Sequence, residues 1–490
     1  MRVFLAQFDL GWFHECFGHW IPWPSLAWIT GGALLLGLAT WLMVGVGGQR
    51  AACVARLGGL VWRRSQFCRG WLITGDTGSG KTTSGINQLA HQVFQNEPSW
   101  GGLCIDEKGV YWETLSAMAI HYGRGEDLIH LQVRTGDEDS AWKPPHRFNL
   151  VGDRSIPFSA YAKFVVDTAT SLGQGGDKGF FKTQSQTHIA HALELLHELG
   201  RSVTLVGAYE VLTDSTALDE ALEDLAELLP TPERESLERH FQSRLLNQPP
   251  EQLGGVRETI ANHLQHFLSP AVAEVFCPRD GSTFDLRSLD DGKILLVTMP
   301  QMFQTERRYV NTFLKLLFYN HALRRFDRPK ALRAKNNLLI LWADEAQRFM
   351  TASEDGTSDY NCVDVIREAG ATIVAAAQST TSFLPPLGAD KSKVLTLNLR
   401  NRLVFRSADE TDALQSADFL GKKRVIKRNW GFSGGKRSVN YTETEEHRIK
   451  PHILRTLRDH ECVIVHCESG FRRQRLPPLD PQGTVPAWYR

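Results

Sequence analysis

The sequence has no excess of charge of either sign and few cysteines, and both absences exclude classes of protein. Its 490 residues include 55 basic and 55 acidic side chains, so any contact with a polyanion must come from a local patch. The 8 cysteines are scattered without a C-x-x-C pair, which argues against a zinc site or a disulfide framework and fits a reducing compartment. Internal repeats and low-complexity tracts are also missing. The length predicts two or three units with a substantial core.

One uncharged apolar stretch, residues 27–46, has about the length that spans a bilayer. A cleaved signal peptide is the alternative, but the run starts late and has neither a basic segment before it nor a convincing cleavage site. Basic residues gather after the run, at Arg50, Arg56, Arg63, Arg64 and Arg69. The positive-inside rule therefore predicts a single-pass anchor with the C-terminal bulk in the cytoplasm.

A phosphate-binding loop follows a short apolar run. Residues 75–82 read G-x-x-x-x-G-K-T and stand between a strand pattern and a helix pattern, a context that argues against a chance glycine loop. Backbone N–H groups of such a loop and the positive end of the next helix bind phosphates. Lys81 is expected to reach the β- and γ-phosphates of ATP, and the Thr82 hydroxyl to ligate Mg²⁺. The predicted nucleotide-binding residues are Gly75, Asp76, Thr77, Gly78, Ser79, Gly80, Lys81, Thr82 and Thr83.

Two further apolar runs end in polar residues. Residues 338–345 end in Asp344 and Glu345, a Walker B pattern, and the carboxyl end of a buried strand is where open α/β sheets place ligands. Asp344 is predicted to hold Mg²⁺, and Glu345 to orient or deprotonate the attacking water. The third run ends in Gln378, which is expected to sense the γ-phosphate or to position the attacking water, although an ordinary turn amide is the alternative.

The remaining strand-like runs alternate with helical stretches, which predicts an α/β fold with a mostly parallel P-loop (RecA-like) sheet. Long helical patterns between 154 and 278 predict an inserted all-α domain. The predicted organisation has an outer or interfacial segment (1–24), a transmembrane helix (25–48), a basic juxtamembrane segment (49–69), the first part of the ATPase domain (70–153), the all-α insertion (154–278) and the second part of the ATPase domain (279–490).

The only concentrated basic stretch covers residues 422–437 and includes Trp430 and Phe432. Such a segment can grip a phosphate backbone and stack bases. An exposed hairpin or a loop without that role is an equal alternative.

In their order along the chain, these elements resemble the type IV coupling proteins of conjugative DNA transfer, the TraG/TraD-like branch of the FtsK–HerA group of motors. The likeness spans about residues 60–480. Residues 104–109, C-I-D-E-K-G, look like the D-P-K-G box of the family with Glu107 in place of proline, and residues 148–150 look like its N-P-L box with Leu150 in that place. Residues 367–378 are similar to its segment of an arginine followed by a sensor glutamine.

The resemblance implies a membrane-embedded homo-hexameric ATPase in a bacterial inner membrane. Its substrates and partners would be DNA, relaxosome proteins and the components of a type IV secretion channel. Arg367 becomes a candidate arginine finger contributed to a neighbouring subunit, with an ordinary surface arginine as the alternative. Family members commonly carry two transmembrane helices, whereas this sequence predicts one.

Two other functions fit the same residues. A related membrane P-loop ATPase could serve protein secretion or defence against foreign DNA. A membrane adaptor could use the nucleotide only as a switch, but such a site has no need of Glu345.

Overall fold

The structure is a computed structural model that describes residues 53–134, 142–173, 179–333, 335–353, 356–433 and 436–489. Residues 54–490 form one compact unit. The outer segment (1–24) and the predicted transmembrane helix (25–48) lie outside the described residues. Among the residues that are described, no helix is both long and apolar enough to cross a membrane.

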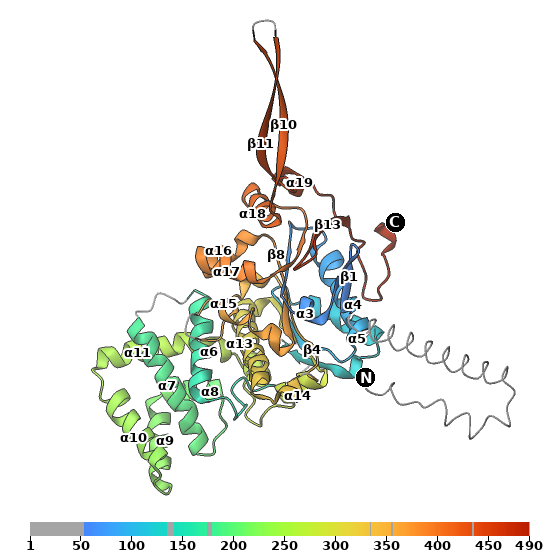
Figure 1. The fold of residues 1–490 in the computed structure, drawn as a ribbon. Coiled ribbons are helices and arrows are strands. Elements are labelled where there is room, and N and C mark those ends of the chain that lie inside the picture. The colour runs from blue at the N-terminus through green and yellow to red at the C-terminus, as the bar shows by residue number, and fades with distance from the viewer. Residues whose placement is uncertain are drawn as a thin grey trace, which may run out of the picture. The chain divides into compact units, whose positions relative to one another are not determined.

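A nine-stranded sheet forms the centre of this unit (Figure 1). In spatial order its strands are β13 (Gly470–Arg475), β12 (Glu461–His466), β9 (Asn401–Val404), β3 (Trp71–Thr74), β8 (Ala371–Ala377), β7 (Leu339–Asp344), β4 (Gly101–Asp106), β6 (Ile294–Thr298) and β5 (Leu128–Gln132). All neighbours from β9 to β5 are parallel, and β12 and β13 are antiparallel additions at one edge. The predicted α/β class and the largely parallel sheet are confirmed.

Helices cover both faces of the sheet, so its central strands are apolar throughout rather than alternating. On β3, Ile73 packs into the cluster that contains helices α4 (Asn87–Asn96) and α5 (Tyr111–His121). Its neighbour Leu72 packs into the other cluster, which contains helix α13 (Gln304–Arg324). Successive side chains of a strand point to opposite faces, and this alternation explains the two clusters.

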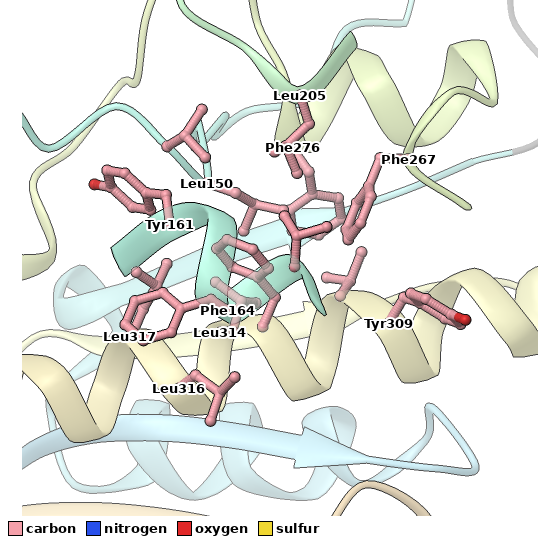
Figure 2. Packing of buried hydrophobic residues seen from close by; sticks show 14 of the residues in the cluster. Leu150, Tyr161, Phe164, Leu205, Phe267, Phe276, Tyr309, Leu314, Leu316 and Leu317 are labelled. Atoms are coloured by element: carbon pink, nitrogen blue, oxygen red, sulfur yellow. The ribbon is translucent and has the colours of Figure 1, made fainter. Parts of the chain in front are cut away.

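A group of helices occupies the stretch in which the all-α insertion is predicted. They are α6 (Phe158–Ser171), α7 (Gly179–Glu198), α8 (Leu205–Thr213), α9 (Ser215–Glu227), α10 (Pro232–His240), α11 (Pro250–Leu264) and α12 (Pro270–Phe276), with a π-helix at Phe241–Leu246. The described residues of this stretch include no strand. Figure 2 shows Tyr161 and Phe164 of α6 beside Leu314 and Leu317 of α13, so the helical region shares one core with the sheet. The domain boundaries at 154 and 278 stay a prediction.

Two short helices and a long hairpin lie between strands β9 and β12. The hairpin pairs β10 (Lys422–Ser433) with β11 (Lys436–His447) and forms a sheet of its own. Its base joins α18 (Glu410–Leu420) and α19 (Pro451–Arg455), and it extends away from them in Figure 1. The remaining strands and α-helices of the described residues are β1 (Ala55–Leu57), β2 (Leu60–Trp62), α3 (Arg64–Phe67), α14 (Lys330–Arg333), α15 (Asp359–Cys362), α16 (Leu384–Leu387) and α17 (Ala389–Asn398).

Candidate nucleotide site

The predicted phosphate-binding loop connects strand β3 to a helix that starts at Lys81. The first helical turns are a π-helix, Lys81–Ile86, which continues into α4. Gly78 and Gly80 have φ angles of +84° and +104°, a region that favours glycine. At Gly80 there is also no room for a side chain, because a Cβ would lie 2.7 Å from Nδ1 of His460. These two glycines let the loop curl in front of the helix N-terminus, where anions bind.

Lys81 lies buried at the base of the loop. Its ammonium group donates hydrogen bonds to the carbonyl oxygens of Gly75 and Asp76, at 2.7 and 2.9 Å. Burial lowers the pKa of Lys81, while the nearby carboxylates of Glu345 and Asp344 act in the opposite direction. The cation is therefore held within the loop beside both carboxylates of the Walker B pattern.

The remaining predicted loop residues divide between buried supports and an exposed rim. Ser79 is buried and donates its hydroxyl to the Asp76 carbonyl oxygen at 2.8 Å, which closes the loop on itself. Thr77 and Thr83 are exposed. These two threonines are accessible to solvent at the rim of the loop.

Asp344 ends strand β7 next to the loop, and its Oδ2 lies 3.4 Å from the Thr82 hydroxyl. Burial, with the charges of Asp106 and Glu345, raises the pKa of Asp344 to about 6. Crowded negative charge of this kind is relieved by a bound cation. One carboxylate and one hydroxyl leave coordination positions for phosphate and water oxygens, as Mg²⁺ prefers, so the residues fit that ion. No cluster of three or more metal-ligating side chains exists among the described residues.

Glu345 has a left-handed backbone with φ +51°, which is uncommon outside glycine. Burial opposes its ionisation, but a hydrogen bond from Gln347 and the charges of Lys108 and Lys81 outweigh this effect and lower the pKa of Glu345. The Gln347 amide lies 2.8 Å from Oε2, and the Lys108 ammonium lies 3.4 Å from Oε1. An ionised, oriented carboxylate at this position is able to accept a proton from water.

Gln378 and Arg367 lie beyond opposite ends of strand β8. Gln378 follows the carboxyl end, where its backbone oxygen accepts a hydrogen bond from Gly75 N at 3.3 Å and its side chain is exposed. Arg367 precedes the strand in a short 3-10 helix, Ile366–Ala369, with 41% of its side chain exposed. The seven residues of β8 span about 23 Å, so Arg367 does not reach the P-loop of its own chain.

Lys108 gains a role at this site that its sequence context did not reveal. Asp106, which pairs with Asp344 across β4 and β7, accepts hydrogen bonds from the backbone N–H groups of Lys108, Val110 and Tyr111 at 2.8–2.9 Å. This turn directs the Lys108 ammonium to Glu345. The C-I-D-E-K-G segment was noted for its likeness to the D-P-K-G box, but no sequence signal indicated this ion pair.

His460 and Arg406 support the loop from the C-terminal part of the chain, and neither was predicted. The Nδ1 atom of His460 lies 2.8 Å from the buried Ser84 hydroxyl, and its backbone N–H donates to the Ser79 carbonyl oxygen at 2.9 Å. Arg406 pairs with Asp76 at 2.7 Å and with Asp459 at 2.8 Å. Single residues so distant in sequence carry no pattern from which these contacts could be found.

A family model matches the last quarter of the chain. Residues 360–473 match the type IV secretion-system coupling protein DNA-binding domain. The matched range begins after the Walker B strand and includes Arg367, Gln378 and the long hairpin. No curated protein matches the chain in sequence.

Solved structures match almost the whole chain at low identity. The unbound bacterial conjugative coupling protein TrwBdeltaN70 is 16% identical, with a TM-score of 0.63 over 89% of this chain and 91% of that one. The chain has the fold of a type IV coupling protein. The plasmid coupling protein TrwB in complex with ADP and Mg²⁺ is 15% identical (TM-score 0.60; 89% and 93% covered). VirB4 of Thermoanaerobacter pseudethanolicus is 14% identical (TM-score 0.51; 88% and 97% covered).

These comparisons confirm the resemblance to coupling proteins that the sequence motifs indicated. The predicted ligands, ATP and Mg²⁺, agree with those of solved TrwB structures, which include complexes with ADP and Mg²⁺ and with a non-hydrolysable ATP analogue.

Proposed function

We propose that this chain is a membrane-anchored motor that hydrolyses ATP to move DNA, or a DNA–protein conjugate, toward a type IV secretion channel. The observation that carries the proposal is the meeting of Lys81, Thr82, Asp344 and Glu345 at one edge of a coupling-protein fold. The DNA-binding domain matched at residues 360–473 supports DNA as the substrate.

The residues of the site divide the chemistry between them. Thr82 and Asp344 would hold Mg²⁺, which would supply positive charge to the phosphates of the nucleotide. Lys81 binds the same phosphates once its ammonium turns from the loop carbonyls to the nucleotide. Glu345, ionised and oriented by Gln347 and Lys108, accepts the proton of the attacking water. Gln378 would contact the γ-phosphate or that water.

The position of Arg367 supports assembly into a ring, with a hexamer as the expected size. The strand between Arg367 and Gln378 keeps the arginine away from the nucleotide of its own chain, and its exposed side chain is available to a neighbour. An arginine supplied in trans stabilises the charge that develops on the transferred phosphoryl group.

The membrane anchor and the protein partners complete the proposal. Residues 27–46 would cross the bacterial inner membrane once and leave the ATPase domain in the cytoplasm. The helical region, α6–α12, is the surface we assign to relaxosome proteins or other cargo. The channel components would meet the membrane side of the ring.

ATP turnover of the full-length protein, measured with and without single- and double-stranded DNA, tests the motor. Lys81→Ala should abolish turnover, whereas Lys330→Ala, which alters an exposed lysine far from the site in sequence, should leave it unchanged. Stimulation by DNA is expected. Turnover that ignores DNA would refute DNA as the substrate and favour protein secretion or an adaptor role.

Mixing two inactive variants tests the arginine in trans. Lys81→Ala lacks the phosphate-binding lysine but keeps Arg367, and Arg367→Ala has the opposite defect. In a random 1:1 assembly about a quarter of the interfaces combine an intact P-loop with an intact neighbouring arginine, so about a quarter of wild-type turnover should return. A mixture as inactive as its components would refute the role in trans.

A further inference from the structure

The hairpin β10–β11 belongs neither to the nine-stranded sheet nor to the nucleotide site, and one of its faces has no role assigned so far. Each strand has 12 residues, which corresponds to a length of about 40 Å. Its base is fixed by the Arg448 N–H, which donates to the Gly421 carbonyl oxygen at 2.9 Å, and by His447, 2.8 Å from Asp418. A two-stranded hairpin is only marginally stable alone in water. A hairpin of this length is therefore expected to bind a partner along its strands.

Charge is distributed unevenly along the hairpin. Near the base the cations have acidic partners, since Arg424 lies 3.4 Å from Glu443 and Lys427 lies 2.6 Å from Glu446. From residue 428 to residue 442 the sequence has three basic residues and no acidic one. The outer half of the hairpin is therefore complementary to a polyanion.

One face of this outer half combines aromatic rings with a cation. Arg428 pairs directly with Tyr441, and Trp430 follows two residues along the same strand, so the three residues share a face. The Arg428 guanidinium lies 4.2 Å from the centre of the Trp430 ring. Trp430 and Tyr441 are 58% and 66% exposed, and Ile426, which is 70% exposed and pairs with Glu443, lies next to them toward the base. Large apolar side chains exposed together in this way mark an interaction site.

The opposite face of the outer half carries polar side chains in place of aromatic rings. Asn429 pairs with Asn440, and Lys427 pairs with Thr442, so the side chains there are polar and not aromatic. The aromatic rings of the hairpin therefore lie on the Arg428 face, where Trp430 and Tyr441 are exposed to solvent.

We propose that the Arg428 face, formed by Arg428, Trp430 and Tyr441, binds single-stranded DNA. Unpaired bases stack on the exposed rings, and the guanidinium holds the phosphate backbone, a combination that tolerates any sequence. Stacked duplex DNA offers no such base faces to the rings. The inference rests on the proposed function, because it names the surface through which this motor contacts its DNA.

Fluorescence anisotropy of the full-length protein with a labelled thymidine oligonucleotide, and with a duplex of equal length, tests the face. The double variant Trp430→Ala/Tyr441→Ala should weaken single-strand binding by about tenfold or more, since each stacked base contributes strongly. Arg428→Gln should reduce the slope of log affinity against log salt by about one. The matched control is Asn429→Ala/Asn440→Ala, a directly paired change on the opposite face, which should leave binding unchanged.

The possible outcomes distinguish a failure of the proposed DNA-binding face from a failure of the proposed motor function. ATP turnover without DNA should be the same in all variants, which shows that they are folded. If wild-type protein binds the single strand and the affinity of the aromatic double variant is within twofold of it, the role of the Arg428 face in DNA binding is refuted, while the proposed motor function is not affected. If the double variant loses duplex and single-strand binding equally, base stacking is refuted. If wild-type protein binds no DNA and its turnover ignores DNA, the proposed function itself is refuted.

Discussion

Glu345→Gln separates hydrolysis from nucleotide binding more cleanly than other changes at the site. The amide has the same shape and still accepts the hydrogen bond that Oε2 receives from Gln347 at 2.8 Å. It cannot take a proton from water, and loss of a general base typically lowers a rate by about 10²–10⁴-fold. That range equals about 3–5 kcal/mol in the activation barrier. Loss of the ion pair to Lys108, whose side chain is 58% exposed, costs little stability.

The assay is steady-state ATP turnover beside the affinity for a non-hydrolysable ATP analogue with Mg²⁺. Turnover should fall by at least about a hundredfold, while the analogue binds as tightly or more tightly because one negative charge near the phosphates is gone. Glu107→Gln is the matched control, since Glu107 is also buried at the sheet edge but is paired with Arg308 at 2.7 Å. Turnover of Glu345→Gln within threefold of wild type would refute the role of Glu345 as the base.

Three further predictions concern the loop and the core. Gly80→Ala should lose nucleotide binding, measured with the ATP analogue, because its Cβ would meet His460; unchanged affinity would contradict this packing. Lys315→Met should lower the free energy of unfolding in urea by about 3–5 kcal/mol, because it leaves the Asp359 carboxylate buried without its cation; a loss below about 1 kcal/mol would contradict it. Burial, with the nearby His191, lowers the pKa of His188 to about 4 and of His240 to about 3, so stability present above pH 6.5 should fall as the unfolded chain takes up protons, by about 2 kcal/mol per histidine at pH 5; a His188→Gln/His240→Gln variant with the same dependence would contradict this.

The sequence was sufficient for the centre of the fold because its signals there are local. Each strand next to the nucleotide site is a continuous apolar run, and the P-loop and the Asp344–Glu345 pair stand directly after such runs. Parallel strands bring their carboxyl ends to one edge, which places Thr82 beside Asp344 although 262 positions separate them. The order of the strands in the sheet was not predicted, because it depends on contacts between distant segments.

The supports of the site could not be predicted because they depend on tertiary contacts between single residues. Lys108 reaches Glu345 only because Asp106 organises the turn before α5. His460 takes a left-handed conformation with φ +65°, an outlier that no composition signal marks. Likewise, the basic stretch at 422–437 fitted either a nucleic-acid contact or an exposed hairpin or loop without that role, and only cross-strand pairing shows which residues share a face.

The contacts of Arg406 and His460 also connect the nucleotide site to the hairpin. The chain leaves the P-loop at Arg406, forms α18, the hairpin and α19, and returns to the P-loop at Asp459 and His460. Both ends of this segment contact the phosphate-binding loop. A displacement of the loop on nucleotide binding would therefore move the base of the hairpin. Arg406→Ala removes the pairs with Asp76 and Asp459 but no predicted catalytic group. It should therefore reduce the stimulation of ATP turnover by single-stranded DNA by more than it reduces turnover without DNA, whereas equal loss of both would mean that Arg406 only stabilises the loop.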